Sequence, residues 1–412
     1  MISHIHGARP RRQPNLLRIA AGALCLGVLL AGCETTPSGS VGQPGDGRQI
    51  IQPKPTRARD GLTPPFMAGR SITRFGVLLP FSAISQESQA LYDAAELALF
   101  EQGNPALLLI PRDSGTSASQ AASSVNALSK DGVELIIGPL LRDSVLGARD
   151  PARRANAPLI AFSNDRVAAG NGAYLLSFQS EEEVQRVIAF AAGQSVRRIA
   201  ILAPDTEYGR RVEIEARRIA PLSGAQIVAS QLYTPTENGA VLGAQALARA
   251  AIPSGVQAVF IPGDGASLRA AASALAAAGL DSNRVKLLGL GSWGLNAAFR
   301  EPVLAGAWVA APDPAARRGF ERRFKTAYGR EPTRLASLAY DAVILAAQIA
   351  LNPEQDTRAQ LERPQGFQGV DGLFRFRPNG SIQRALPIFR IEANGVAILL
   401  EPALRAFPPS DV

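Results

Sequence analysis

The chain has few of the residues on which most enzyme active sites depend. Its 412 residues include only two histidines, His4 and His6, and two cysteines, Cys25 and Cys33. Removal of the first 32 residues would leave no histidine, which excludes Ser–His–Asp and Cys–His catalysis and leaves only carboxylates as metal ligands. The carboxylates are scattered, and no pair has a spacing that implies shared acid–base chemistry. We therefore expect a protein that is not an enzyme and that needs neither a cofactor nor a metal.

Positive charge is also scarcer than the totals suggest. The whole chain carries 43 basic and 35 acidic residues, a net charge of +8. Four arginines and no acids lie in residues 1–32, so 39 basic and 35 acidic residues remain beyond them, a net charge of +4. These basic residues are dispersed, as on a solvated surface, rather than gathered into a stripe. The pattern argues against a nucleic-acid partner.

The N-terminus, residues 1–32, has the pattern of a secretory signal. Four arginines precede a charge-free run, Ile19–Gly32, which is too short to span a bilayer stably. Leu30–Cys33 (LAGC) resembles the bacterial lipobox, in which the cysteine is lipidated and becomes the first mature residue. The alternative is an ordinary signal peptide with an incidental cysteine. Because Glu34 stands where an aspartate would resemble an inner-membrane retention signal, we expect a periplasmic protein whose lipid on Cys33 anchors it to the outer membrane.

Residues 33–70 are expected to form a disordered tether. Glu34–Arg70 contain six prolines and six glycines and show no helical or strand period. A coil of this length spans about 35 Å on average. With one cysteine removed and the other acylated, no disulfide is expected, so the folded part depends on its core alone.

From Thr73 onward, short apolar runs alternate with alanine-rich amphipathic stretches. Fully apolar runs of this kind suit parallel strands buried on both faces, and the alternation predicts right-handed crossovers. The expected strands are 75–79, 107–110, 135–137, 159–162, 199–202, 226–232, 258–261, 285–290 and 308–310. The expected helices are 89–101, 119–130, 181–194, 208–222, 240–250 and 266–278. Ser180–Glu183 has the pattern of a capping box, and Asp313–Pro314 that of an N-cap followed by proline.

Nine strands are too many for one small sheet, which predicts an α/β fold with two Rossmann-like doubly wound lobes. We place lobe one at 71–179 and lobe two at 180–311, with residues 312–412 returning as helices and strands that complete both lobes. In this last segment, a Pro-Asn-Gly turn inside Phe367–Gly380 and the Asn394–Gly395 pair between two apolar runs predict hairpins, the C-terminal β-hairpin extension of the fold.

Four motifs occur in the order found in type I periplasmic binding proteins, the family of leucine/isoleucine/valine receptors. They are Ile136–Leu140 (IIGPL), Pro158–Ser163 (PLIAFS), Asp205–Gly209 (DTEYG) and Phe367–Gly372 (FQGVDG). The layout from about residue 72 to 400 resembles that fold as a whole. The resemblance implies two lobes that face each other across a ligand cleft.

Several segments are most similar to the lipoprotein branch of penicillin-binding protein activators. They are 108–114 (LLIPRDS), 136–145, 161–166 (AFSNDR), 372–384 and 386–389 (LPIF). In that branch the same fold stimulates bifunctional peptidoglycan synthases from the outer membrane. The resemblance therefore implies a bifunctional penicillin-binding protein as partner, and a lipid anchor with a long tether suits that role.

Ligands of doubly wound sheets bind at the carboxyl ends of the strands, where helix N-termini present free N–H groups. The loops at these ends supply the candidate cleft residues. By the receptor motif, Tyr208 matches a lobe-two tyrosine and Ser163 a lobe-one hydroxyl. Arg142 stands at the position of another hydroxyl in the receptors, and Ser292 or its neighbour Trp293 stands at the position of their acid. Arg142 could equally belong to a solvated first helical turn. The full set of candidates is Ser82, Leu140, Arg142, Ser163, Asn164, Tyr208, Asp264, Ser292 and Trp293.

Gly289–Gly294 (GLGSWG) spells the dinucleotide-binding fingerprint directly after an expected strand. The fingerprint needs a helix that opens at these glycines, whereas the sequence that follows is short and stops before Pro302. A glycine-rich cleft loop is the better interpretation. Trp293 could then stack on a ligand at the cleft rim or pack in the core.

Two functional hypotheses follow. The leading one is a lipoprotein that activates a bifunctional penicillin-binding protein by direct contact. The alternative is a periplasmic receptor that binds a small amino-acid-like ligand for an ABC transporter. The first depends on the lipobox, the tether and the branch-like segments, and the second on the fold and Tyr208.

Overall fold

The computed structural model describes residue 64, residue 67 and residues 69–280, 284–294, 301–394 and 396–408. The signal segment 1–32, the lipidation site Cys33 and most of the tether lie outside the described residues, so these remain predictions. All described residues belong to one compact unit, Arg57–Val412. Among them, no helix is both long and apolar enough to cross a membrane.

The first sheet contains five parallel strands in the order β2-β1-β3-β4-β5. Its strands are β1 (Thr73–Leu79), β2 (Leu107–Asp113), β3 (Leu135–Ile137), β4 (Leu159–Ala161) and β5 (Ala173–Leu175), and its crossover helices are α1 (Ser85–Gln102), α2 (Ala118–Lys130) and α3 (Arg142–Arg154). The first four strands confirm the apolar runs of the sequence. β5 was not predicted, because it is only three residues long and follows a loop, Gly170–Gly172, whose residues all have positive φ.

The second sheet has seven strands in the order β15-β14-β10-β9-β8-β6-β7. Its parallel strands are β6 (Arg198–Pro204), β7 (Gln226–Tyr233), β8 (Ala258–Phe260), β9 (Lys286–Leu290) and β10 (Trp308–Ala310), with helices α4 (Ser180–Gly193), α5 (Glu207–Leu222), α6 (Glu237–Ala251) and α7 (Gly265–Ala277). The predicted last hairpin forms as β14 (Ile388–Ile391) and β15 (Ala397–Glu401) and extends this sheet with two antiparallel strands. Two doubly wound sheets confirm the predicted fold class.

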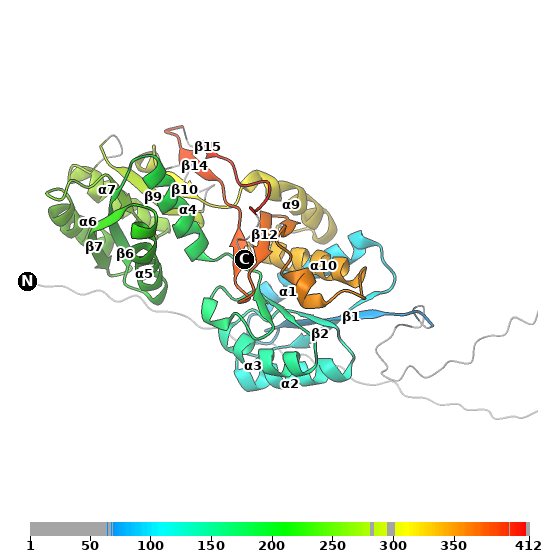
Figure 1. Cartoon of the computed structure of the whole chain (residues 1–412). Coiled ribbons are helices and arrows are strands. Elements are labelled where there is room, and N and C mark those ends of the chain that lie inside the picture. Colours follow the sequence, from blue (N-terminus) through cyan, green and yellow to red (C-terminus); the bar gives the residue numbers. More distant parts are fainter. Residues whose placement is uncertain are drawn as a thin grey trace, which may run out of the picture. The chain divides into compact units, whose positions relative to one another are not determined.

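The chain between β10 and β14 returns to the first sheet. It forms α9 (Pro314–Tyr328), α10 (Ala336–Ala350), α11 (Thr357–Leu361) and a three-stranded antiparallel sheet of β11 (Phe367–Gly369), β12 (Gly372–Phe376) and β13 (Ile382–Arg384). The predicted N-cap is confirmed, because the Asp313 carboxylate accepts the Ala315 N–H at 2.8 Å. Figure 1 shows α10 beside α1, although about 250 residues separate them along the chain.

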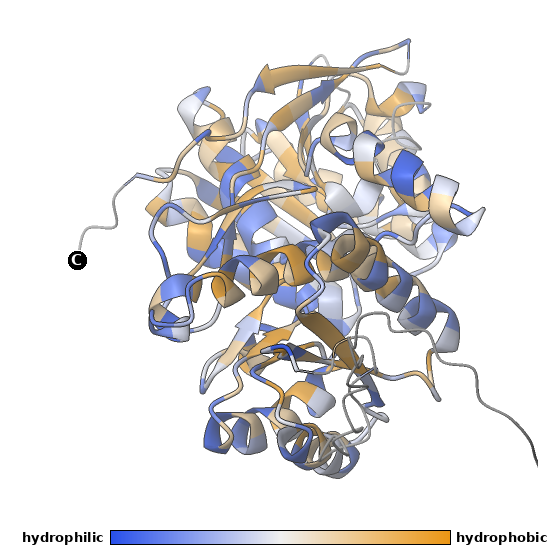
Figure 2. Ribbon diagram, turned by 90° about the vertical axis from the view of Figure 1, so that its right-hand side faces the viewer, coloured by the Kyte–Doolittle hydropathy of each residue, from blue (hydrophilic) through white to orange (hydrophobic). Residues whose placement is uncertain are grey.

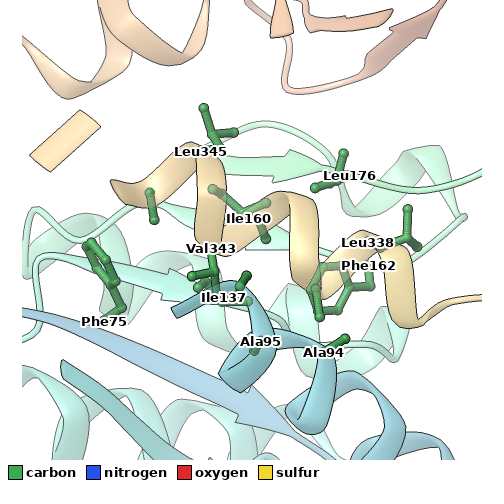
Figure 3. Packing of buried hydrophobic residues seen from close by; sticks show 14 of the residues in the cluster. Phe75, Ala94, Ala95, Ile137, Ile160, Phe162, Leu176, Leu338, Val343 and Leu345 are labelled. Carbon is green, nitrogen blue, oxygen red and sulfur yellow. The ribbon is translucent and has the colours of Figure 1, made fainter. Parts of the chain in front are cut away.

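Burial of α10 joins the returning segment to lobe one. Its side chains Leu338 and Val343 lie in the same core cluster as Phe75 of β1 and Ile160 of β4, as Figure 3 shows. Figure 2 shows that hydrophobic residues concentrate on the strands and on the inner faces of the helices. Because α10 is apolar on most of its surface, it needs cover on several sides, which α1 and the first sheet provide.

The prediction of a capping box at Ser180–Glu183 is wrong. The N-cap of α4 is Gln179, and no side chain caps the helix. The three glutamates are buried and turn to other elements: Glu182 pairs with Arg377 at 2.9 Å, and Glu183 accepts the Gly291 N–H at 2.9 Å. The acidic run therefore lies in the first turn of α4, where it suits the helix dipole, and also makes tertiary contacts.

The glycine-rich loop after β9 is shaped by a tryptophan. A Cβ on Gly289 would lie 2.4 Å from the ring of Trp293. That ring is only 3% exposed, and its N–H donates to the Ile261 carbonyl at 2.8 Å. The chain passes from β9 into a single 3₁₀ turn, Gly291–Trp293. Trp293 is thus a core residue, which confirms the second of the two predictions made for it. Its assignment to the cleft rim is wrong.

We expect Gly289→Ala to lower the free energy of unfolding by about 1–3 kcal/mol, because the added methyl overpacks the Trp293 ring inside a buried strand. Gly193→Ala is the matched control. A Cβ there meets nothing within 4 Å, so its stability should be unchanged or slightly higher. Urea unfolding measures both; equal stability of the two variants would contradict this account of the glycine.

Candidate ligand-binding site

A pocket of about 1020 Å³ lies at the carboxyl ends of strands from both sheets. Leu140, Phe162 and Phe178 follow β3, β4 and β5 of the first sheet. Tyr208, Ser292 and Ala311 follow β6, β9 and β10 of the second. Parallel strands bring these loops to one edge of each sheet, the position at which doubly wound folds bind ligands.

The lobe-one wall is built around the start of α3. Gly138 has a φ of +98°, and a Cβ there would lie 2.0 Å from the Leu78 carbonyl oxygen, so only glycine allows this turn. The turn places Leu140 and Leu141 in the wall. Leu141 is the N-cap of α3 and provides no side-chain cap, so the first-turn N–H groups remain available to an anion.

The lobe-two wall presents hydroxyl groups. The Tyr208 hydroxyl lies 3.5 Å from the Ser292 hydroxyl, at the limit of a hydrogen bond. Tyr208 stands in the first turn of α5, where the Thr206 hydroxyl caps the helix by accepting the Gly209 N–H at 3.0 Å. Burial raises the pKa of Tyr208 above its ordinary value, so the phenol is protonated at neutral pH and can donate to a ligand.

The returning segment supplies a third wall that is strongly charged. Asp371 accepts hydrogen bonds from Arg334 at 3.0 Å and from the Ser337 hydroxyl at 2.6 Å. Arg317 donates to the Ser337 hydroxyl at 2.7 Å and to the carbonyls of residues 333 and 334. Burial raises the pKa of Asp371, but the adjacent arginines and Ser337 outweigh it, so the net shift is downward and this buried carboxylate stays ionised.

Glu183 lies where the second and third walls meet. Burial raises its pKa to about 7, against the opposing effects of the Gly291 N–H, Arg334 and Arg384. A Cβ on Gly291 would lie 2.9 Å from the Glu183 carboxylate, so the glycine makes room for this contact. The carboxyl is therefore held by the loop after β9, and its pKa is raised well above the ordinary value of a glutamate.

The structure brings together four of the nine candidate cleft residues, namely Leu140, Asn164, Tyr208 and Ser292. The others make contacts of their own. Ser82 donates to Asp113 at 2.7 Å, Arg142 pairs with Asp165 at 3.4 Å as an exposed first-turn residue of α3, and the buried Ser163 hydroxyl accepts the Asp165 N–H at 3.3 Å. Asp264 is the exposed N-cap of α7, and Trp293 is in the core.

The sequence analysis missed the residues that dominate the charge of the pocket. They are Arg317, Arg318, Arg334 and Asp371. Two uncharged lining residues, Ser177 and Phe178 of the segment that joins β5 to α4, were also missed. No spacing in the sequence connects α9 or β12 to the loops of the first sheet. The only available signal was the expectation that residues 312–412 return to complete the lobes.

The described residues contain no group of three or more acidic, histidine or cysteine side chains that could hold a metal ion. Comparison with curated protein sequences finds no significant match. The family model for periplasmic binding proteins matches residues 73–396. The chain belongs to the periplasmic binding protein family.

Solved structures support the same fold for this periplasmic binding protein. A branched-chain amino acid ABC transporter protein from Rhodospirillum rubrum is 18% identical with a TM-score of 0.68, over 80% of this chain and 100% of the other. A ligand-binding protein for branched-chain amino acid transport from Burkholderia xenovorans is 18% identical with a TM-score of 0.63, over 82% and 96%. An ABC transporter substrate-binding protein from Desulfitobacterium hafniense in complex with Leu is 20% identical with a TM-score of 0.57, over 80% and 99%.

Glu183 should make stability depend on pH. Its pKa is about 7 in the folded protein and about 4.5 in the unfolded chain, so the folded state binds more protons between these values and loses stability as the pH rises through them. We expect Glu183→Gln to reduce this loss between pH 5 and pH 8 by about 1–3 kcal/mol. Urea unfolding at four pH values measures it, with the exposed Glu237→Gln as control. An unchanged pH dependence would contradict the burial of this carboxyl.

Proposed function

We propose that this periplasmic binding protein is a receptor that binds a small amino-acid-like carboxylate in the pocket and delivers it to an ABC transporter. The observation that carries the proposal is the pairing of two walls in one pocket: the uncapped start of α3 at Leu141, and the hydroxyls of Tyr208 and Ser292. Helix N–H groups suit a carboxylate, and the hydroxyls suit an amino or second polar group.

The pocket also has the composition of a small-molecule site. Leu140, Phe162, Phe178 and Leu335 provide apolar surface around the few polar groups, an arrangement typical of ligand pockets. The structural relatives described as ABC transporter substrate-binding proteins support this role, and the one from Desulfitobacterium hafniense holds Leu. A receptor of this kind acts by binding and needs no catalytic residue. The secretory signal expected from the sequence and the family agree on a periplasmic location.

We expect the purified full chain to bind at least one member of a panel of amino acids and related carboxylates, as measured by thermal shift and titration calorimetry. Tyr208→Phe should lower the affinity for that ligand about tenfold, because it removes one hydrogen bond. Tyr340→Phe is the control, because it removes a hydroxyl that bonds Glu101 instead. A panel without any ligand would contradict the receptor function, and equal affinities for the two variants would contradict the ligand contact assigned to Tyr208.

Activation of a bifunctional penicillin-binding protein is the second candidate function. One observation favours it: amino-acid receptors carry an acid after a late strand of lobe two, whereas here Gly291 and Ser292 occupy the loop after β9, and the nearby Glu183 bonds to the Gly291 N–H. The activator-like segments, the expected lipid on Cys33 and the tether add support from the sequence. In this role the surface of the lobes would contact the synthase.

The activator function predicts that the full-length protein in detergent raises the polymerisation rate of the organism's bifunctional synthase several-fold at saturation. An unrelated lipoprotein is the control for the detergent and lipid. The same preparation, used as bait with solubilised envelopes, should enrich the synthase above that control. An unchanged rate at saturating protein would contradict activation and leave the receptor function as the only candidate.

A further inference from the structure

We propose that the pocket is built for a dicarboxylate, whose second carboxylate is held by Arg318, Arg334 and the hydroxyl of Ser177. This inference rests on the proposed receptor function and specifies its ligand class. All three residues line the pocket, Arg318 and Arg334 on the returning segment and Ser177 on the β5–α4 segment, and we call them the distal anion subsite. The first carboxylate would occupy the start of α3.

The acidic side chains of the pocket are already committed to partners in the protein. Asp371 is bonded by Arg334 and Ser337, and Glu183 accepts the Gly291 N–H. Asp313 caps α9 through the Ala315 N–H, and Glu321 accepts from Arg317 at 2.9 Å. None of these carboxylates is left to attract a cationic ligand group.

The basic side chains are not all neutralised in this way. Arg317 is buried, and its guanidinium donates hydrogen bonds to Glu321, Ser337 and two backbone carbonyls. Arg318, one residue further along α9, is exposed and makes no hydrogen bond or ion pair with any described residue. The uncommitted charge in the pocket is therefore positive and favours an anionic ligand group.

Arg334 is held in place for such a group. Its guanidinium stacks on the Phe178 ring with 3.6 Å between the guanidinium carbon and the ring centroid, and one of its nitrogens bonds Asp371. The side chain is still 48% exposed, and its other nitrogens have no bonding partner among the described residues. A guanidinium fixed on one edge and free on the other can bind a carboxylate with little loss of conformational entropy.

The third member of the subsite is a buried hydroxyl without a partner. Ser177 lines the pocket and is 1% exposed, yet its Oγ has no hydrogen-bond partner among the described residues. The Nε of Arg384 donates to the Ser177 carbonyl at 3.0 Å and so fixes the backbone that carries the hydroxyl. A buried polar group of this kind is costly unless a ligand or water satisfies it, and a carboxylate oxygen would accept its proton.

The experiment compares pairs of ligands that differ only in the second carboxylate. Titration calorimetry with the purified full chain uses glutamate against glutamine, and glutarate and adipate against their monoamides. We expect the dicarboxylate of at least one pair to bind about tenfold or more tightly, because the second carboxylate gains charge-assisted hydrogen bonds. The preference should weaken at high salt.

Two variants test the subsite itself. Arg318→Gln should reduce the preference for the dicarboxylate over the monoamide several-fold, because only the carboxylate carries the charge that the guanidinium attracts. Ser177→Ala should weaken binding of the dicarboxylate several-fold, because the carboxylate loses one hydrogen bond. Ser177→Ala removes a hydroxyl that makes no bond in the protein, so the fold should tolerate it, which thermal unfolding without ligand verifies. Arg249→Gln, which removes one positive charge from the exposed face of α6, is the matched control.

Each other outcome has one meaning. Equal affinities within every pair would overturn the dicarboxylate subsite and leave the receptor function intact. A preference that survives Arg318→Gln, together with a dicarboxylate affinity that Ser177→Ala leaves unchanged, would likewise overturn the subsite, because the second carboxylate would then bind elsewhere. If no carboxylate of either kind binds, both the subsite and the receptor function fail.

Discussion

The parallel direction of the strands is the constraint on which the site depends. Each crossover between parallel strands returns the chain to the same end of its sheet, so successive loops gather at the carboxyl edge. Residues as distant in sequence as Leu140, Tyr208 and Ser292 therefore line one pocket. The short strands β3, β4 and β8 pair in parallel with their neighbours and so align the loops at this edge. All three strands are fully buried, which explains their apolar sequences.

Hydrophobic burial fixes the position of the returning segment between β10 and β14. Helix α10 is too apolar to stand in water, so it packs on α1 and on the first sheet and fixes the position of everything around it. The loop that precedes α10 then carries Arg334 to the pocket, and β12 follows Asp371. The ion pair between these two residues joins α10's N-terminal loop to the small antiparallel sheet. The polar wall of the pocket is thus a consequence of hydrophobic burial behind it.

Sequence alone was sufficient for elements with a strong local signal. The apolar run at 135–137 is β3 and the run at 308–310 is β10, because strands buried on both faces leave little room for polar residues. It failed where the determining contact is remote. The glutamates of α4 begin a helix as predicted, but the capping box does not form, because their side chains contact Arg377, Gly291 and Arg211. Trp293 was a candidate for the cleft rim, but the glycines around it admit its ring into the core. The same limit hid Arg318 and Ser177, because the other residues that line the pocket with them lie on distant segments of the chain.

The loop after β9 has no acidic residue between Gly291 and Gly294, and this shapes the charge of the pocket. With Gly291 in place, Glu183 reaches the loop and bonds its N–H, and a side chain on residue 291 would collide with that carboxyl. Glu183 therefore holds the loop after β9, and the raised pKa of its carboxyl lowers its negative charge near neutral pH. No acid of this loop is available to an amino group of a ligand, whereas Arg318 and the unbonded nitrogens of Arg334 are available to an anion. This distribution of charge is the reason for proposing a ligand that is net negative rather than a zwitterion of zero net charge.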